Sequence, residues 1–148
     1  MRIIPMSQNE CSELLERVST GRLGCALNDQ PYVVPVGFSY EAPNHIYVFS
    51  TLGKKIEWMR QNQKVCLQAE EVANRSNWDS VVVMGTYLEL REPQYSAQRQ
   101  HAIERLGEFS QWWKTPLAER RESVSDLEIE TVFFRIDVTE MSGLRTIS

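Results

Sequence analysis

Apolar and polar residues alternate along several short segments of the chain, a pattern typical of β-strands with one buried face. Residues 32–41 show it most clearly, because Val34, Val36, Phe38 and Tyr40 would share one bulky face. The opposite face is small, since it carries Pro35, Gly37 and Ser39. A small face either lets a flat ring lie against the backbone or marks an irregular edge strand. The alternation and apolar runs predict strands over residues 22–27, 32–41, 45–50, 64–70, 80–90 and 130–138.

A second periodicity, with apolar residues three and four apart, predicts helices over residues 7–19, 53–62 and 94–109. Ser7 and Glu10 have the spacing of a capping box at the first helix, and Gly21 is expected to stop it. The strand 80–90 is apolar on both faces, so both are expected to be buried, and Gly85 within it suggests a bulge or a close backbone approach.

The remaining segments are polar or mixed and are expected to be irregular. Residues 72–79 are predicted to form a loop that carries Trp78, and the tail beyond residue 143 is expected at the surface. Residues 110–126 hold Trp112 and Trp113 and are predicted to form a helical or mobile cover. The order of helices and meandering strands favours a mainly β fold, a small closed antiparallel barrel of six strands with flanking helices.

Composition limits the function without defining it. The 148 residues suit a single domain, 1–148, and the net charge of -4 argues against a nucleic-acid partner. No apolar run approaches the ~20 residues that span a bilayer, so no membrane partner is expected. The three cysteines are an odd number without paired spacing, which favours free thiols and a cytoplasmic location.

The turn after the third strand is the best candidate for binding chemistry. Ser50 and Thr51 are followed by Gly53, Lys54 and Lys55, where a helix is expected to begin. Hydroxyls, helix N-terminal N–H groups and two cations suit a phosphate monoester. The run does not match the P-loop pattern, and an ordinary junction with solvated lysines has the same composition.

Five short motifs occur in a characteristic order. They are Val33-Val34-Pro35-Val36-Gly37-Phe38, Ile46-Tyr47-Val48-Phe49-Ser50-Thr51, Gly53-Lys54-Lys55-Ile56, Lys64-Val65-Cys66 and Trp78-x-Ser80-Val81-Val82-Val83-x-Gly85-Thr86. In this order the chain resembles the pyridoxamine 5'-phosphate oxidase-like flavoproteins, and most closely the short branch that includes nitroimidazole-resistance proteins. The resemblance implies a split β-barrel of Greek-key topology, and a homodimer with flavin mononucleotide (FMN) at its interface.

The resemblance also implies roles for individual residues. Pro35, Val36 and Gly37 would run along the flavin ring. Ser50 and Thr51 would bond phosphate or ribityl oxygens, Lys54 and Lys55 would bind the phosphate, and Ile56 follows in the same turn. Ser80 would lie near the ring with Trp78 close by, from the other subunit.

The function expected from this resemblance is that of an FMN-dependent oxidoreductase acting on a small molecule. No side chain stands out as a general acid or base, so no catalytic residue and no metal site is assigned. One alternative is a flavin-binding module without turnover that acts as a carrier, sensor or regulator. Another is a barrel that holds haem or a deazaflavin, for which His45 and His101 are the only histidines available as axial ligands.

Overall fold

The computed structural model describes residues 1–109 and 131–148, and the predicted cover with Trp112 and Trp113 lies outside them. The elements follow one another as β1 (Arg2–Pro5), α1 (Gln8–Arg17), β2 (Thr20–Leu27), β3 (Gln30–Glu41), β4 (His45–Thr51), α2 (Lys54–Gln61), β5 (Lys64–Asn74), β6 (Asn77–Glu89), α3 (Ser96–Arg105), a short 3-10 turn (Leu106–Phe109) and β7 (Thr131–Ile147).

Seven strands of the described residues form one antiparallel sheet in the order β1-β7-β4-β3-β2-β5-β6. Because β6 also pairs with β7, the six strands from β2 to β7 close into a ring. This confirms the predicted split-barrel class, which removes the exposed edges that so many apolar strands would otherwise present. The strand β1 was not predicted; it adds to the outer end of β7, where Arg2 pairs with Ile147.

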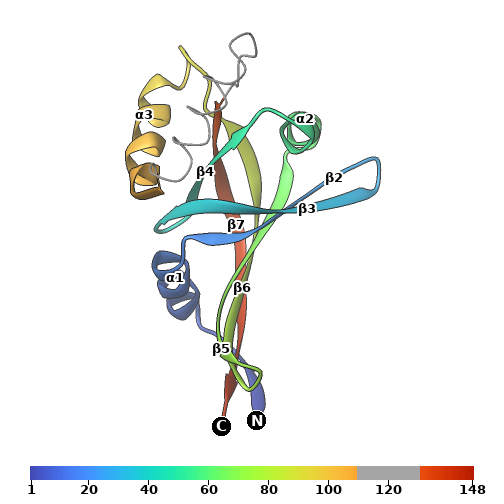
Figure 1. Ribbon diagram of the computed structural model, residues 1–148, viewed down its shortest axis with the longest axis vertical. Coiled ribbons are helices and arrows are strands. Elements are labelled where there is room, and N and C mark those ends of the chain that lie inside the picture. Colours follow the sequence, from blue (N-terminus) through green and yellow to red (C-terminus); the bar gives the residue numbers. More distant parts are fainter. Residues whose placement is uncertain (110–130) are drawn as a thin grey trace, which may run out of the picture.

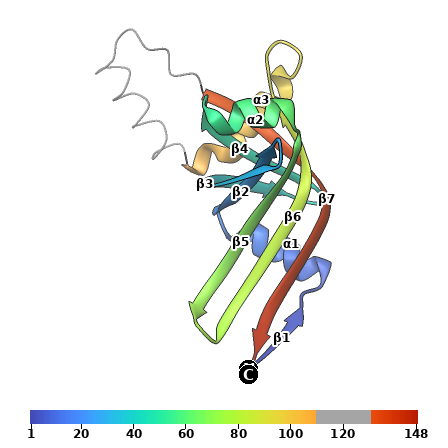
Figure 2. The same cartoon turned by 90° about the vertical axis from the view of Figure 1, so that its right-hand side faces the viewer.

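The strands β5, β6 and β7 continue well past the barrel and form, together with β1, an extension that we call the arm (Figures 1 and 2). The predicted loop 72–79 is therefore wrong for most of its length, because β5 runs to Asn74 and β6 begins at Asn77. The tail is likewise part of β7, which pairs with β6 as far as Arg145 opposite Asp79. The N- and C-termini lie side by side at the far end of this arm (Figure 1).

The first helix packs its apolar side against the barrel and starts as predicted. The Ser7 hydroxyl accepts a hydrogen bond from the Glu10 N–H at 3.1 Å, while the Glu10 carboxylate accepts from the Ser7 N–H at 2.8 Å. Gly21 does not stop this helix, however, because it lies inside β2. A Cβ there would stand 2.6 Å from the Gln68 carbonyl oxygen, so the glycine permits a close approach of β5.

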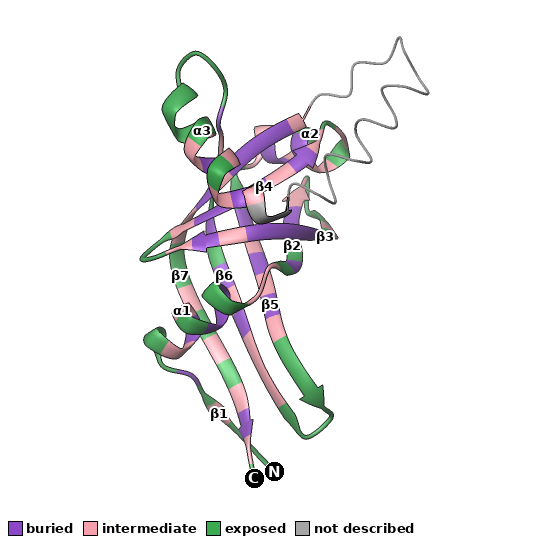
Figure 3. Ribbon diagram, turned by 60° about the vertical axis from the view of Figure 1, so that its left-hand side comes forward, coloured by how far each residue is buried: buried purple, intermediate pink, exposed green. Residues whose placement is uncertain are grey.

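Buried side chains line the inside of the barrel, and exposed residues lie at the tip of the arm and on the outer sides of the helices (Figure 3). In β6, Val81, Val83 and Tyr87 are buried, but Met84 is exposed, so the prediction that both faces are buried is wrong. The closed ring gives the strand one inner and one outer face. Gly85 matches its prediction, because the register shifts next to it and a Cβ would meet Ile136 at 2.6 Å.

The helices α2 and α3 cover the end of the barrel away from the arm (Figure 1). Ile56 and Met59 of α2 join the main core. A smaller apolar cluster lies beneath α3 and contains Tyr47, Leu90, Ala102, Leu106 and Phe133. No helix within the described ranges combines the length and the apolar character that crossing a membrane requires.

Candidate functional site

The barrel is split between β3 and β4. Their pairing ends with Phe38 opposite Val48, after which the two strands follow different partners. Among the described strands, β3 pairs from there with β2, as Pro35 does with Arg22, whereas β4 pairs with β7. Within the described part of the chain, the facing edges of both strands therefore lack a strand partner. Backbone donors and acceptors on such edges need other partners, which a bound polar ligand can supply.

The split is bordered by the residues singled out from the sequence. Val36 points into the core with 8% of its surface exposed, whereas Val33 is 64% exposed on the opposite face. Pro35 is also exposed, as the predicted division of β3 into a bulky inner face and a small outer face requires, whereas Gly37 of the predicted outer face is buried. The outer face of β3 thus presents the small side chain of Pro35 beside the exposed Val33.

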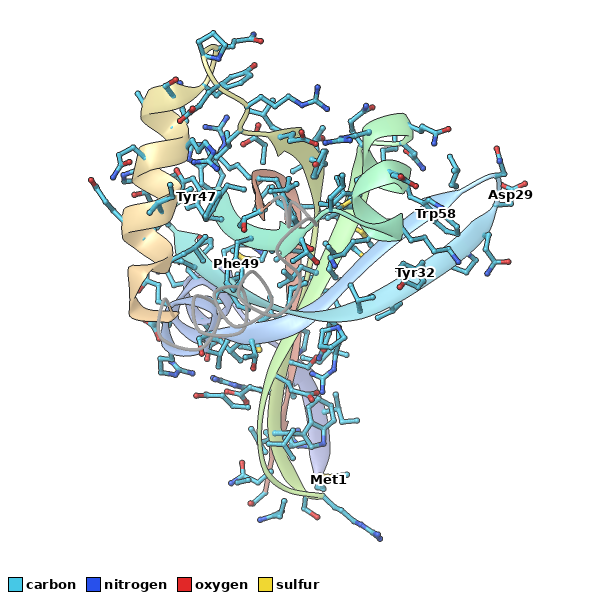
Figure 4. The ribbon with its side chains drawn as sticks, turned by 45° about the horizontal axis from the view of Figure 1, so that its top comes forward. Met1, Asp29, Tyr32, Tyr47, Phe49 and Trp58 are labelled. Carbon is cyan, nitrogen blue, oxygen red and sulfur yellow. The ribbon has the colours of Figure 1, made fainter. Side chains whose placement is uncertain are left out.

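The turn that follows β4 is open and leads directly into α2. A Cβ at Gly53 would have no neighbour within 4 Å, and no side chain caps the helix at this residue. The Lys54 ammonium lies 5.3 Å from the ring centre of Tyr32 and 5.0 Å from that of Trp58. Figure 4 shows these two aromatic residues next to each other between α2 and the β2–β3 hairpin. They fix Lys54 at the helix N-terminus, where its charge adds to that of the free N–H groups.

The other residues of this turn are more enclosed. Ser50 is 7% exposed and its hydroxyl donates to the Thr51 carbonyl at 3.0 Å. Lys55 is half-buried; burial lowers its pKa, and the nearby Cys25 thiol opposes that shift. Ile56 is fully buried in the core, so only its backbone can contribute to a ligand site. The two lysines thus differ, because Lys54 is exposed and Lys55 is partly withdrawn from water.

A polar network on the outer face of the barrel was not predicted. Arg22 forms an ion pair with Glu70 at 3.1 Å, and the Gln68 amide donates to the hydroxyl of Ser80 at 3.0 Å and to Glu70 at 3.2 Å. Because Arg22 lies opposite Pro35 in the sheet, the network leads from the split to Ser80. The alternation of polar and apolar residues in β2 and β5 could have predicted that polar side chains gather on this outer face.

The structure brings most of the predicted residues together, but Trp78 and Ser80 lie on β6 where it enters the arm. Ser50, Thr51, Lys54 and Lys55 form one turn beside the split, and β3 contributes the small face. Trp78 lies on the arm, where its backbone N–H donates to the Thr146 hydroxyl at 3.0 Å. Within one chain Trp78 is therefore separate from the turn, and its expected place near the ring of the other subunit stays a prediction.

The sequence is similar to known proteins over almost its whole length. The family model described as pyridoxamine 5'-phosphate oxidase matches residues 7–145, and the chain therefore belongs to this family. An uncharacterized protein of Rhizobium meliloti is 38% identical over 140 residues, which cover 93% of this chain and 91% of that protein. A crystal structure named as a FAD-binding protein of Mesorhizobium loti is 38% identical, with a TM-score of 0.80 and coverage of 100% and 99% of the two chains.

More distant structures share the fold. A FAD binding protein of Mycobacterium smegmatis is 20% identical with a TM-score of 0.66, and covers 97% of this chain and all of its own. A candidate 5-nitroimidazole antibiotic resistance protein of Bacteroides thetaiotaomicron is 16% identical with a TM-score of 0.67, over 98% of this chain and 89% of its own. Together with the family model, these comparisons confirm the resemblance to the split-barrel flavoproteins.

Proposed function

We propose that this protein is a flavin-dependent oxidoreductase that acts on a small molecule. The observation that carries the proposal is the split between β3 and β4, which places an open strand edge with a small face next to a turn rich in hydroxyls and lysines. The relative of Mesorhizobium loti, named as FAD-binding and 38% identical, supports the same class of cofactor.

The residues fit the two parts of a flavin mononucleotide group. Pro35, Val36 and Gly37 border the split, and we assign them to the ring. At the turn, the hydroxyls of Ser50 and Thr51 and the ammonium groups of Lys54 and Lys55 supply hydrogen bonds and charge for one phosphate. The sequence predicted FMN as the cofactor; the proposal assigns the mononucleotide portion, which FMN and FAD share.

The chain's part in the reaction is to bind and orient. A flavin held at this site would supply the redox chemistry between a donor such as a nicotinamide cofactor and the small-molecule substrate. The Arg22–Glu70–Gln68–Ser80 network on the outer face of the barrel would border the bound ring. No catalytic side chain is assigned, since the redox chemistry belongs to the cofactor.

We also propose a homodimer that completes the site. Large apolar side chains are exposed on the arm and on the outer face of β3, notably Ile3 at 53%, Val72 at 60%, Leu144 at 49% and Val33 at 64%. Burial of such residues against a second copy would stabilise a dimer. Trp78 and Ser80, which lie on the arm, would then reach the ring site of the partner. The three free cysteines are consistent with the reducing cytoplasm, which we propose as the location.

The absorption spectrum of the purified protein tests the cofactor. Flavin bands that bleach on addition of NADH or NADPH are expected, followed by recovery with an electron acceptor. A colourless protein that takes up neither FMN nor FAD would reject the proposal, and a Soret band would instead indicate haem. A flavin-loaded protein that shows no turnover over a broad panel of donors and acceptors would favour the alternative of a carrier, sensor or regulatory module.

A further inference from the structure

Five residues form a transverse row across the outer face of the barrel. Residues that pair across neighbouring strands lie on the same side of a sheet, and each member of the row pairs with the next in the order β3, β2, β5, β6 and β7. We call it the Arg22 row, and it consists of Pro35, Arg22, Gln68, Val82 and Ser142. Because Pro35 is assigned to the flavin ring, Arg22 is the next side chain beside the ring on this face.

Arg22 supplies the positive charge of this part of the face. In the part of the chain that the structure describes, the two rows that flank the Arg22 row contain no lysine, arginine or histidine. Their members are Val33, Gly24, Cys66, Met84 and Glu140 on one side, and Gly37, Thr20, Glu70, Ser80 and Leu144 on the other. A ligand that lies beside Pro35 would therefore meet one guanidinium group and no other cation of these rows.

Arg22 takes part in an ion pair that it can exchange. Its Nη1 lies 3.1 Å from a carboxylate oxygen of Glu70, and 53% of the Arg22 side chain and 36% of the Glu70 side chain are exposed. Ion pairs that are this open to water contribute little to stability. A second carboxylate can therefore compete with Glu70 for the guanidinium.

Glu70 keeps a partner when Arg22 turns away. The Gln68 amide donates to the Glu70 carboxylate at 3.2 Å and to the Ser80 hydroxyl at 3.0 Å. A carboxylate that lost its last hydrogen bond would oppose the exchange, whereas this one stays bonded to Gln68. The network thus leaves Arg22 available to a ligand and holds Glu70 in place next to it.

The surroundings of Arg22 select the body of that ligand. Gly24 follows on the same side of β2, and the Cys66 thiol occupies the place that a Cβ of Gly24 would take. Met84, the strand partner of Cys66, is 47% exposed. These groups form an apolar strip next to the guanidinium, which an aromatic or aliphatic body can cover while its acid group meets Arg22.

We infer that the proposed oxidoreductase takes substrates that carry a carboxylate on an apolar body, and that Arg22 is the residue that selects them. A guanidinium offers two parallel N–H groups to a carboxylate, a match that a neutral amide of the same shape lacks. Glu70 competes for the same guanidinium and so sets how tightly the acid is held. This inference rests on the proposed function, because it takes the flavin ring to lie along Pro35.

Benzoate and benzamide test the inference, because they have the same shape and differ in charge. Each is titrated into the flavin-loaded protein, and binding is followed by calorimetry and by the change in the flavin absorption spectrum. Benzoate is expected to bind at least about tenfold more tightly than benzamide. In Arg22→Gln the benzoate affinity should fall to that of benzamide, while an unchanged FMN affinity verifies that the variant is folded. Arg22→Lys should restore part of the preference, since it keeps the charge but loses the two-pronged contact.

Glu70→Gln distinguishes recognition from a structural role of the ion pair. Removal of the competing carboxylate frees Arg22, so benzoate should bind about threefold more tightly than to the parent protein. If the pair only stabilised the sheet, Arg22→Gln and Glu70→Gln would both weaken benzoate binding. Arg17→Gln is the matched control, because Arg17 forms a similarly exposed pair with Glu71 at 2.8 Å on the opposite face of β5. Its loss should leave benzoate binding unchanged.

The outcomes separate the two proposals. Benzoate that binds no more tightly than benzamide, or a preference that persists in Arg22→Gln, would overturn the assignment of Arg22 while the flavin site stands. Tighter binding of benzylamine than of benzoate would also overturn it, because it would make Glu70 the anchor of a cationic substrate. A joint loss of FMN and benzoate affinity in Arg22→Gln would do the same, since it would place Arg22 in the flavin site or in the fold. Uptake of neither FMN nor FAD by the parent protein would reject the proposed function itself.

Discussion

Arg60 and Glu89 form a two-pronged ion pair that fastens α2 to β6. The Nε of Arg60 donates to one carboxylate oxygen at 2.8 Å and its Nη2 donates to the other at 3.0 Å. Only 11% of the Glu89 side chain is exposed, and the Tyr87 hydroxyl adds a third hydrogen bond at 2.6 Å. The pair fixes the last turn of the helix whose first residues are Lys54 and Lys55. It therefore positions the phosphate turn relative to the barrel, that is, the turn of Ser50, Thr51, Lys54 and Lys55 that we assign to the flavin phosphate.

Glu89→Gln is expected to reduce the free energy of unfolding by about 2 kcal/mol, because it leaves two guanidinium groups without their carboxylate. Chemical denaturation at pH 7 measures this. Glu92→Gln is the matched control: that carboxylate is 66% exposed and 4.0 Å from Arg99, and its loss should change the stability by less than about 0.5 kcal/mol. Equal stability of the two variants would show that the Arg60–Glu89 pair does not hold α2 in place.

The same carboxylate predicts how stability depends on pH. Burial alone would raise the pKa of Glu89, but hydrogen bonds from Arg60, Tyr87 and Arg91 outweigh it and lower the pKa from 4.5 to about 2. Because the pKa of Glu89 is lower in the folded than in the unfolded state, the ionised carboxylate stabilises the folded state at pH values above about 4.5. This contribution, about 3 kcal/mol, is lost as the pH falls from about 4.5 to about 2. Stability measured over this window should fall more steeply in the parent protein than in Glu89→Gln. If stability fell equally steeply with pH in both proteins, Glu89 would not be the group that causes this pH dependence.

Alternation was sufficient to predict the strands of the barrel. Each of the six segments has one face that the core requires to be apolar, so the sequence within the segment carries the information. The capping box of Ser7 and Glu10 was equally local and was also predicted correctly. The turn of Ser50, Thr51, Lys54 and Lys55 could be singled out as a candidate because its hydroxyls and lysines lie close together in the chain.

Features that depend on distant partners could not be predicted. The strand β1 has only four residues, and its partner Ile147 is at the other end of the chain. The arm was taken for a loop because its polar residues pair with β7, as Asp79 does with Arg145. The Arg60–Glu89 ion pair could not be predicted for the same reason, since its two residues come from α2 and β6.

Gly21→Ala is expected to destabilise the fold by about 2 kcal/mol, because the new Cβ would lie 2.6 Å from a backbone oxygen of β5 and 3.2 Å from the Phe38 ring. Gly53→Ala provides the comparison, since nothing lies within 4 Å of a Cβ there and the backbone is extended. Thermal unfolding should show a lower midpoint temperature than the parent protein for Gly21→Ala, and an unchanged one for Gly53→Ala. Similar midpoints for both variants would mean that β2 and β5 can separate at little cost.

Leu144→Asp is expected to weaken the proposed homodimer. The side chain is 49% exposed on the arm opposite Ser80, and a carboxylate there would be desolvated without a partner if a second copy covers it. Light scattering during size-exclusion chromatography should show a dimer for the parent protein and a larger monomer fraction for the variant. Asn9→Asp, which adds the same charge on the exposed side of α1, should remain dimeric. A monomeric parent protein, or a variant as dimeric as the parent, would contradict the interface.

Removal of both lysines of the phosphate turn is expected to weaken flavin binding strongly. In Lys54→Ala/Lys55→Ala two charge-assisted contacts would be lost, at a cost on the order of 3 kcal/mol, or about a hundredfold in affinity for FMN. Riboflavin, which lacks the phosphate, should bind the variant and the parent protein equally. Titrating both proteins with FMN and with riboflavin therefore distinguishes the loss of a phosphate contact from a general effect on the flavin site.

The single substitutions are expected to differ, because the two lysines have different surroundings. Lys54 lies against Tyr32 and Trp58, so Lys54→Ala also removes a contact that holds α2 on the β2–β3 hairpin. Lys55 is half-buried with a lowered pKa, so its charge interacts with an anion through less water. Lys55→Ala should therefore cost more FMN affinity, and Lys54→Ala more stability. Lys64→Ala, an exposed lysine at the start of β5, should change neither. Unchanged FMN affinity in the double variant would contradict the assignment of the flavin phosphate to this turn.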